Sequence, residues 1–414
     1  MTPDPVWLGP RRARRLAERF GTPLFVYSRR LLRGRCRALQ RAFPGAELHY
    51  AMKANSNPSL LRLFTRWGLG IDAVSPWEVA LALAVGADPL KVLFTGNNPS
   101  PADLAAVHAS GVRVNLDALP TLEAWARLSG PGREVSLRLN LDVGGGHHRH
   151  VVTGGRDSKF GLTLAELPEA RRIAGAHGHR IVGLHQHIGS GVFDVKLFLA
   201  ALEPLLALVP DFPDLSFVDA GGGFGVPYRP EERPVDLAAW GHAVLSRVQR
   251  AREEHHRPGL RLLLEPGRYV VCEAGVLLST VTTVKPRGDR VWVGLDTGMH
   301  HLVRPALYQA WHPVRSYPRG RRERPTARCW LVGSICESGD VLAEARALPL
   351  PEAGELVALG NAGAYGYVMA SHYNLRPRPA EVLVDGDRFT LLRAAETFEE
   401  VVNPREIARA NKMR

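Results

Sequence analysis

Short apolar segments alternate with longer helix-like stretches through the first two thirds of the chain. Stretches such as "PSLLRLFTRW", "PWEVALALAVG", "ADLAAVHAS" and "TLEAWARL" separate eight segments that are typical of strands. In chain order these strand candidates are "LHYAMK", "GIDAVS", "VLFTGN", "VRVNLD", "VSLRLNL", "IVGLHQHI", "LSFVDAGG" and "LLLEPG". Eight strand–helix units predict a (β/α)8 barrel, and a doubly wound open sheet is the structural alternative.

The pattern changes after Arg268, where strand-like segments follow one another with little helix between them. The last of them, "AEVLVDGDRFTLLR", contains Asp385-Gly386, which is a hairpin signal. We therefore predict a barrel over residues 28–270 and a second, mostly β domain. That domain combines residues 1–27, as an N-terminal strand, with residues 271–414. Inside it, the Pro- and Arg-rich stretch "HPVRSYPRGRRERPT" predicts an exposed loop.

Polar residues recur at or just after the ends of the predicted barrel strands. Lys53, Asp72, Asn115, His187 and Glu265 all occupy such positions. In barrel enzymes the carboxyl ends of the strands converge on one mouth, where the chemistry takes place. These positions therefore favour the barrel over the open sheet, and they predict that residues far apart in the sequence share one pocket.

Lys53, in "HYAMKAN", is unusual because this chain rarely uses lysine. Of its 53 Lys plus Arg residues only six are lysines. A lysine amine can lose its proton and attack a carbonyl, whereas a guanidinium stays protonated and cannot. The alternative is an ordinary strand-end lysine with a packed stem and a solvated head.

The bulk composition excludes several classes of protein. No apolar run is long enough to cross a membrane, and "MTPDPVWLGP" lacks the features of a signal peptide. The four cysteines form no CxxC pair, which favours a reducing cytoplasm over a disulfide framework. The net charge of +12 permits nucleic-acid binding, but no basic stripe interleaved with aromatic residues or finger motif accompanies it. The charge fits an anionic cofactor and substrate better, so we expect neither a membrane nor a nucleic-acid partner.

Two segments after the last barrel strands suit an anionic ligand. "DAGGGFGVPY" offers consecutive glycines whose N–H groups can approach a phosphate, although it lacks P-loop and dinucleotide spacing. In "EPGRY" a Pro-Gly turn places Glu265 at the mouth and Arg268 just beyond it, and this carboxylate can pair with a protonated ring nitrogen. The alternatives are a glycine turn without a ligand and a Glu–Arg surface pair.

The remaining candidates admit more than one interpretation. In "HQHIGSG", His185 and His187 alternate with apolar residues. A metal site there lacks a third ligand at convincing spacing, so we predict no metal. A ring stacked on a flat cofactor, with Ser190 on a phosphate, needs only this segment. In "SICESGD", Cys336 beside Glu337 suits a proton donor and an amine-binding group, or a buried structural cysteine.

One cofactor accounts for these features together. Pyridoxal 5'-phosphate has an aldehyde for Lys53, a phosphate for the glycines, a flat ring for His187 and a ring nitrogen for Glu265.

With these motifs the chain resembles the barrel-type pyridoxal-phosphate decarboxylases, and most closely the diaminopimelate decarboxylases. The resemblance runs nearly from end to end. The motifs that carry it are "TPLFVYS", "YAMKANSN", "GIDAVSPWE", "TGGRDSKFG", "GLHQHIGSG", "DAGGGFGVPY", "EPGR", "RPALY", "CESGD" and "GAYGYVMASHYNLRPRPAEVLVDG".

The resemblance implies a role for each candidate residue. Lys53 would form the imine with the cofactor, His187 would stack on its ring, and Glu265 would keep its nitrogen protonated. The phosphate would be held by Ser190, Gly222, Gly223, Gly267 and Tyr365, with Arg268 also at the cofactor. The substrate would be bound by Arg268, Arg304 and Tyr308 at its distal carboxylate and by Glu337 at its distal amine, with Tyr365 also contacting it. Cys336 would reprotonate Cα from the neighbouring subunit of a homodimer.

The implied reaction is decarboxylation of meso-2,6-diaminopimelate to L-lysine and carbon dioxide, the last step of lysine biosynthesis. Barrel-type alanine racemases place an arginine against the ring nitrogen, so Glu265 favours decarboxylation. The alternatives are a decarboxylase of ornithine, arginine or a D-amino acid, and a catalytically inactive regulatory homologue. Pro99, His300 and His301 depart from the pattern of the family, and so does the loop "NLDVGGGHHRH". These departures bear on substrate recognition.

Overall fold

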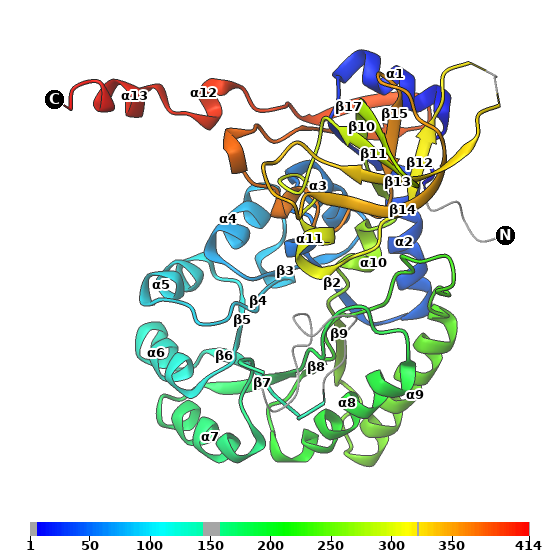
Figure 1. Ribbon diagram of the computed structural model, residues 1–414. Coiled ribbons are helices and arrows are strands. Elements are labelled where there is room, and N and C mark those ends of the chain that lie inside the picture. Colours follow the sequence, from blue (N-terminus) through cyan, green and yellow to red (C-terminus); the bar gives the residue numbers. More distant parts are fainter. Residues whose placement is uncertain (1–5, 144–157, 321–322, 414) are drawn as a thin grey trace. The chain divides into compact units, whose positions relative to one another are not determined.

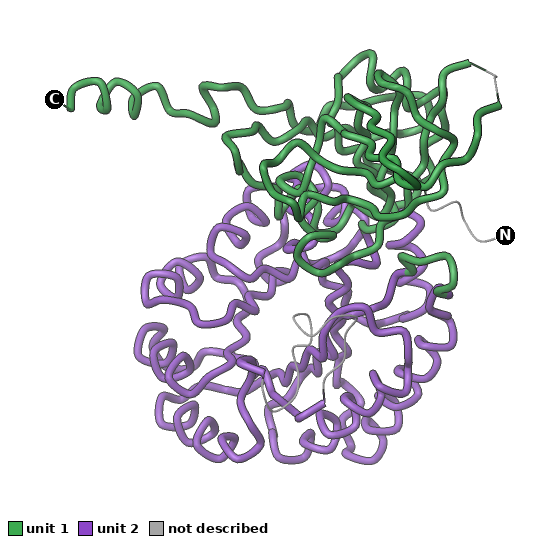
Figure 2. Tube along the Cα trace, in the orientation of Figure 1, with its two compact units in different colours: residues 1–32, 227–232, 271–414 green, residues 33–226, 233–270 purple. Residues whose placement is uncertain are grey.

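The computed structural model describes residues 6–143, 158–320 and 323–413. Within them the chain forms two compact units (Figure 2). The barrel unit contains residues 33–226 and 233–270, and the β unit contains residues 1–32, 227–232 and 271–414. In the part of the chain that is described, no helix is both long and apolar enough to cross a membrane.

The barrel unit is built on a closed barrel of parallel strands (Figure 1). The strands are β2 (Glu47–Ala51), β3 (Gly70–Ala73), β4 (Val92–Phe94), β5 (Arg113–Leu116), β6 (Glu134–Arg138), β7 (Arg180–His185), β8 (Phe217–Asp219) and β9 (Arg261–Leu264). β9 pairs with β2, which closes the barrel. The eight predicted strands and the predicted barrel are confirmed, and the open sheet is excluded.

Helices surround the barrel, and their first turns are fixed by local sequence (Figure 1). The helices are α2 (Arg29–Ala42), α3 (Pro58–Arg66), α4 (Pro76–Ala84), α5 (Pro101–Ser110), α6 (Leu119–Ser129), α7 (Leu167–Ala176), α8 (Val195–Ala207), α9 (Leu237–Glu254) and the short α10 (Arg268–Val271). Ser75 caps α4 by accepting a hydrogen bond from the Glu78 N–H, and Ser100 forms a capping box with Asp103 at α5. These two caps define where the loops after β3 and β4 end.

The β unit is a sheet in which the N-terminal strand is central. Its strands are β1 (Leu24–Ser28), β10 (Gly275–Arg287), β11 (Arg290–Leu295), β12 (Val314–Tyr317), β13 (Thr326–Val332), β14 (Val341–Pro349), β15 (Leu356–Leu359), β16 (Ala380–Asp385) and β17 (Arg388–Arg393). β1 runs antiparallel to β10 and parallel to β16, and the hairpin predicted at Asp385-Gly386 joins β16 to β17. The helices of this unit are α1 (Pro10–Phe20), α11 (Arg304–Tyr308), α12 (Phe398–Val401) and α13 (Pro404–Ala410).

The loop predicted for "HPVRSYPRGRRERPT" is wrong in its first part, which forms strand β12. β12 pairs with β15, and Tyr317 is buried in the apolar core that also contains Leu16 of α1. The Tyr317 hydroxyl donates to the carbonyl oxygen of Leu8 at 2.6 Å. Because prolines and arginines dominate the composition of this stretch, its sequence does not show the pattern of a strand. The strand is stabilised by tertiary packing. Residues 321–322 lie outside the described residues.

Candidate active site

Lys53 lies just beyond the carboxyl end of β2, in a 3₁₀ turn from Met52 to Ala54. Its Nζ is 2.9 Å from Oδ2 of Asp72, a fully buried residue of β3. The Thr95 hydroxyl, at the end of β4, donates to the other carboxylate oxygen of Asp72. Three consecutive strands therefore fix the position of one amine, whose side chain remains about one-third exposed.

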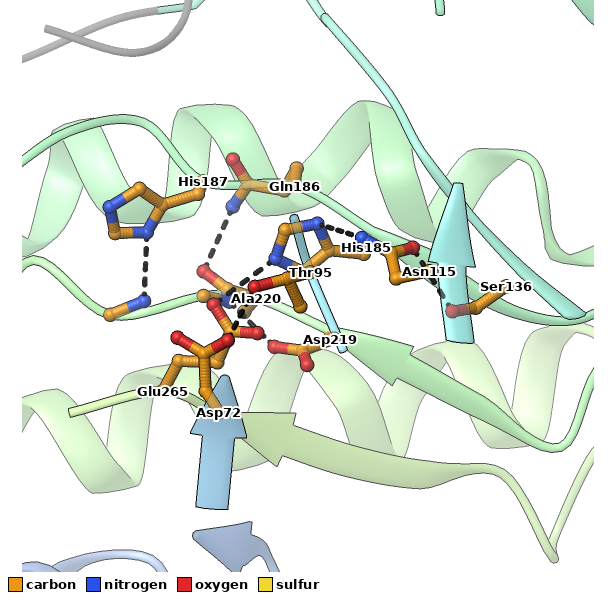
Figure 3. A network of polar contacts seen from close by, with 12 residues as sticks. Asp72, Thr95, Asn115, Ser136, His185, Gln186, His187, Asp219, Ala220 and Glu265 are labelled. Atoms are coloured by element: carbon orange, nitrogen blue, oxygen red, sulfur yellow. Dashed lines mark hydrogen bonds and ion pairs between the residues drawn. The ribbon is translucent and has the colours of Figure 1, made fainter. Parts of the chain in front are cut away.

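Glu265 follows β9 and ends a chain of buried hydrogen bonds that crosses the barrel (Figure 3). The Ser136 hydroxyl is 3.0 Å from Oδ1 of Asn115, and Nδ2 of Asn115 is 3.0 Å from Nδ1 of His185. Because Asn115 donates to Nδ1, the Nε2–H of His185 is left to donate to Oε2 of Glu265, at 3.2 Å. We call Ser136, Asn115, His185 and Glu265 the barrel relay. It leaves Oε1 of Glu265 buried and without a hydrogen-bond partner in the described structure.

The charges around the barrel relay keep Glu265 ionised. Burial raises the pKa of the Glu265 carboxyl, but the hydrogen bond from His185 and the charge of Lys53 lower it to below its usual range. Next to it, burial and then the charge of Glu265 raise the pKa of Asp219 well above its usual value. Of two neighbouring buried carboxyl groups, Glu265 therefore carries the charge and Asp219 holds a proton.

Arg138, at the end of β6, adds a buried cation to this interior. Burial lowers the pKa of its guanidinium, and the charges of Glu265, Asp117 and Asp72 raise it. Arg138, Thr95, Ser136 and Asp219 are not among the site residues predicted from the sequence. The available signal was their position, because all four end a predicted strand or lie within one, beside the chosen residues.

His185, Asp219 and Glu265 also have the composition of a metal site, and their ligand atoms lie within 4.8 Å of one another. The sequence supplied two histidines without a third ligand, whereas the fold places two carboxyl groups beside His185. However, His185 already directs one ring nitrogen to Asn115 and the other to Glu265. The cluster is therefore arranged as a hydrogen-bonded relay. The histidine-rich loop "GGHHRH" lies outside the described residues, and so do the first five residues of "TGGRDSKFG".

His187 lies beyond the end of β7 and faces the glycine turn that follows β8 (Figure 3). The N–H of Gly222 donates to its Nδ1 at 3.1 Å. Burial, followed by the charge of Lys53, lowers the pKa of His187 well below its usual value. The His187 ring is therefore neutral. A neutral ring is suited to stacking on a flat aromatic partner beside a cation.

The glycine turn approaches its neighbours too closely for any side chain. A Cβ on Gly222 would lie 2.1 Å from the carbonyl oxygen of Glu265. A Cβ on Gly223, whose φ is +97°, would lie 2.6 Å from the carbonyl oxygen of Gly189. Gly267 lies against Ala51 and Ala54, which flank Lys53. Only glycine permits these close approaches, and backbone without side chains is also the requirement for an anion cradle.

Ser190 and Arg268 meet beside this turn. Nε of Arg268 donates to the Ser190 hydroxyl at 3.0 Å, and the arginine is buried. The fold thus brings together all the candidates that the barrel unit contributes, which are Lys53, His187, Ser190, Gly222, Gly223, Glu265, Gly267 and Arg268.

In the β unit, Arg304 at the start of α11 is 1% exposed and enclosed by aromatic rings. Its guanidinium carbon lies 5.3 Å from the ring centroid of Tyr228, 5.6 Å from that of Tyr308 and 5.9 Å from that of Tyr365. Its Nε is buried and has no hydrogen-bond partner among the described residues. Three of the predicted residues, Arg304, Tyr308 and Tyr365, are therefore neighbours, and together they present a cation in an aromatic setting.

Cys336 and Glu337 lie on an exposed turn of the same unit, and two residues that the sequence analysis did not assign hold them. The Asn374 amide contacts Sγ of Cys336 at 3.3 Å, and its Oδ1 accepts from the Cys336 N–H at 3.3 Å. The Tyr373 hydroxyl donates to Oε1 of Glu337, and this hydrogen bond raises the pKa of Tyr373 to about 12. We call Cys336, Glu337, Tyr373 and Asn374 the thiol cluster. The signal in the sequence was the motif "SHYN", which was quoted as part of the resemblance.

Asp340 shapes the turn that carries the thiol cluster. Its buried carboxylate accepts from the N–H of Ile335 at 2.7 Å and from the N–H of Met299 at 2.6 Å. Met299 precedes His300 and His301, two of the departures from the family pattern. Both histidines are buried, and His301 is hydrogen-bonded to Thr297 and to the carbonyl of Pro377. These departures thus lie in the packing behind the turn.

Comparison with known proteins identifies the family. Residues 29–272 match the family described as pyridoxal-dependent decarboxylase, pyridoxal binding domain. The chain belongs to the pyridoxal-dependent decarboxylase family. Its cofactor is pyridoxal 5'-phosphate, and its reaction class is decarboxylation of an amino acid.

Relatives named diaminopimelate decarboxylase match almost the whole chain. That of Methanothermobacter thermautotrophicus is 39% identical, with 95% of this chain and 93% of the relative covered. That of Pseudomonas aeruginosa is 41% identical, with 94% and 93% covered. Among solved structures, diaminopimelate decarboxylase from Helicobacter pylori complexed with L-lysine is 29% identical, with a TM-score of 0.87 and 95% and 99% coverage. Another structure of a diaminopimelate decarboxylase is 34% identical, with a TM-score of 0.89 and 100% and 99% coverage.

The residues of the barrel unit fit this cofactor. Glu265 offers a buried, ionised and unpartnered oxygen to a protonated ring nitrogen, and the relay orients it. The glycine turn offers backbone to a phosphate where a Cβ would clash. His187 offers a neutral ring, and Lys53 offers an amine that is held in place. Each chemical part of pyridoxal phosphate thus has a matching group.

Proposed function

We propose that this protein decarboxylates meso-2,6-diaminopimelate to L-lysine and carbon dioxide, as the last step of lysine biosynthesis. The observation that carries the substrate assignment is Arg304. A buried guanidinium with an unpartnered Nε matches a substrate that has a carboxylate at the far end of its side chain. Diaminopimelate has such a carboxylate, whereas ornithine, arginine and lysine do not. The names of the most similar relatives support the same substrate.

Four assignments describe how the barrel unit would hold the cofactor. Lys53 attaches it through its amine, and the ion pair with Asp72 positions that amine. His187 stacks on the ring. The phosphate is held by backbone and side-chain groups of Ser190, Gly222, Gly223, Gly267 and Arg268, with Tyr365 from the β unit. Glu265 keeps a proton on the ring nitrogen, because an ionised carboxylate in a buried site stabilises the adjacent positive charge.

The bound cofactor supplies an electron sink for the electron pair that remains when carbon dioxide leaves Cα. Within the chain, Arg304 and Tyr308, together with Arg268 and Tyr365, bind the distal carboxylate. Glu337 binds the distal amine, and Tyr373 orients that carboxylate by donating to it. Cys336 would give a proton to Cα in place of the lost carboxyl group, and Lys53 would hold the cofactor through its amine.

The assembly that we propose is a homodimer with shared active sites, in which Cys336 of one copy serves the site of the other. The exposure of the thiol cluster supports this proposal, because Cys336, Glu337, Tyr373 and Asn374 are all exposed in the single chain. We also propose a cytoplasmic location, because all four cysteines are free thiols.

The proposed function is tested by measuring carbon dioxide release from meso-diaminopimelate, L-ornithine, L-arginine and D-lysine, side by side with pyridoxal phosphate added. We expect release from diaminopimelate only. Release from ornithine without release from diaminopimelate would overturn the substrate assignment. Arg304→Gln should raise the KM for diaminopimelate about 10- to 100-fold, because one charge-assisted interaction with the distal carboxylate is lost. Arg315→Gln, a change in strand β12 of the same unit, is the matched control.

A further inference from the structure

A cavity of about 500 Å³ lies in the β unit behind helix α11. It is bounded by Pro305, by residues 309–311, by the first part of β14 and by Arg229. Its lining includes two guanidinium groups, Arg229 and Arg346, and one acidic residue, the exposed Glu344. No residue of the site assigned above lines it.

Arg346 is held rigidly at this cavity. Its guanidinium carbon lies 3.7 Å from the ring centroid of Trp311, and its Nη2 donates to the carbonyl oxygen of His312 at 3.2 Å. Stacking on the indole face and this hydrogen bond fix the plane of the guanidinium. Its Nε is buried but has no hydrogen-bond partner among the described residues. One N–H donor of the oriented Arg346 guanidinium, its Nε–H, is therefore left without a hydrogen bond in the described structure.

The charge at this cavity is also unbalanced. Burial and then the positive charge of Arg229 lower the pKa of Arg346 to about 10, while Glu344 acts in the opposite sense. In the described chain no carboxylate forms an ion pair with Arg346. A half-buried cation such as Arg346 that faces another cation is destabilised unless an anion neutralises both.

We propose that this cavity binds a small oxyanion, a carboxylate or a phosphate, between Arg229 and Arg346. The planar fork of Arg346 matches two oxygens of such a group, and Arg229 supplies a second positive charge at the open side. The residues that line this cavity all belong to the β unit, and none of them is a glycine of the cofactor phosphate cradle.

A second arginine of this unit, Arg328, also stacks on a tryptophan, but its side chain is exposed to solvent. Arg328 lies 5.1 Å from the ring centroid of Trp330, but its side chain is 60% exposed and faces Asp289 at 3.9 Å. That guanidinium has solvent and a carboxylate to neutralise it. Arg328 therefore provides a matched control for the substitution of Arg346.

The test uses the cofactor-loaded full chain, so that the cofactor phosphate cradle is filled. Inorganic phosphate and malonate are titrated separately in a buffer of low ionic strength, and binding is followed by calorimetry and tryptophan fluorescence. We expect saturable binding of at least one anion. Arg346→Gln should weaken it at least about tenfold, which corresponds to one lost charge-assisted hydrogen bond. Arg328→Gln should leave it unchanged.

Arg229→Gln guards against a variant that does not fold, because Arg229 is exposed and its replacement leaves the packing on Trp311 intact. It should weaken binding about threefold or more, as expected for removal of one of the two positive charges. The proposal is overturned if neither anion binds the unmodified chain, or if binding is the same in Arg229→Gln as in the unmodified chain. Stronger binding of phosphate than malonate, or the reverse, identifies the class of oxyanion.

Discussion

Two glutamates of this protein show two ways to position a carboxylate. Glu265 is 4% exposed and is oriented by three buried residues from three other strands. Glu337 is exposed and has one described partner, the phenol of Tyr373. A buried carboxylate stays ionised only if its surroundings are arranged for it, so Glu265 needs the whole barrel. An exposed carboxylate needs no such support, and it is free to meet a substrate or a second subunit.

The same difference separates the two reactive groups. Lys53 is paired with Asp72, and Thr95 holds that carboxylate from the next strand. Cys336 is held by Asn374, which is itself exposed and adopts the left-handed conformation at a φ of 55°. We therefore expect changes in the barrel relay to affect chemistry directly, and changes in the thiol cluster to have smaller effects.

The largest expected effect is at Lys53. Lys53→Ala should abolish the visible absorbance of the bound cofactor and lower kcat by at least about 10⁴-fold, because the attaching amine is lost. Lys53→Arg is the control that keeps a positive charge beside Asp72. It should be equally inactive, since a guanidinium does not attack a carbonyl. Absorbance and turnover retained in either variant would contradict the assignment.

Glu265→Gln should lower kcat by about 10²- to 10³-fold with a small change in KM, because the charge opposite the ring nitrogen is removed while the shape is kept. Steady-state kinetics and the absorbance spectrum of the bound cofactor measure this effect. Asn115→Leu, which breaks the relay two residues away, should give a smaller loss in kcat. A loss of less than tenfold in Glu265→Gln would show that the carboxylate has no electrostatic role.

The buried histidines behind the thiol cluster should make the protein sensitive to acid. Burial lowers the pKa of His300 to about 3 and that of His301 to about 4. Their pKa in the unfolded chain is near 6.5, so the unfolded state binds protons first as the pH falls. The stability they contribute is therefore present above about pH 6.5 and is lost as the pH falls toward their folded-state pKa. At pH 5 the loss is up to about 2 kcal/mol for each histidine.

Urea unfolding at pH 7 and pH 5 measures this loss. The double variant His300→Asn, His301→Asn should show a smaller fall in the free energy of unfolding between the two pH values than the unmodified chain. An equal fall in both proteins would assign the acid sensitivity to other groups.

In the thiol cluster, Asn374→Ala should lower kcat about tenfold, because the amide that orients Cys336 is lost. Asn374→Gly removes the same amide but accepts the left-handed backbone without strain. Equal losses in the two variants assign the effect to the amide. A loss in Asn374→Ala alone would assign it to the backbone.

The smallest expected effect concerns the assembly of the protein into a homodimer. If the sites are shared across a homodimer, Lys53→Ala chains mixed with Cys336→Ala chains should recover about one-quarter of the unmodified activity, because hybrid dimers then contain one intact site. Each variant by itself remains at its low activity. No recovery after co-expression would place Lys53 and Cys336 of the same copy in one site.

The sequence by itself determined the barrel and much of the candidate set. Strand-like segments separated by helix-like ones are local patterns, and the glycines, Glu265 and Lys53 stand out because their residue types are unusual at those positions. Two strands, β12 and β14, were not predicted. Of these, β12 is short and set among prolines and arginines, so its local pattern is weak. It is stabilised by pairing with β15 and by the buried contacts of Tyr317.

Only the tertiary structure decided which residues support the reactive ones. Ser136, Asn115, His185 and Glu265 come from separate strands, and no local pattern connects them. Tyr373 and Asn374 likewise contact Glu337 and Cys336 although they are far from them in the sequence. The spacing of residues along the chain predicts which of them are neighbours on one helix or strand. Hydrogen bonds between different elements depend instead on how a closed barrel or a sheet brings those elements together. The chemistry of Lys53 and Glu265 is thus recognisable in the sequence, and the charges and hydrogen bonds that position them follow from the fold.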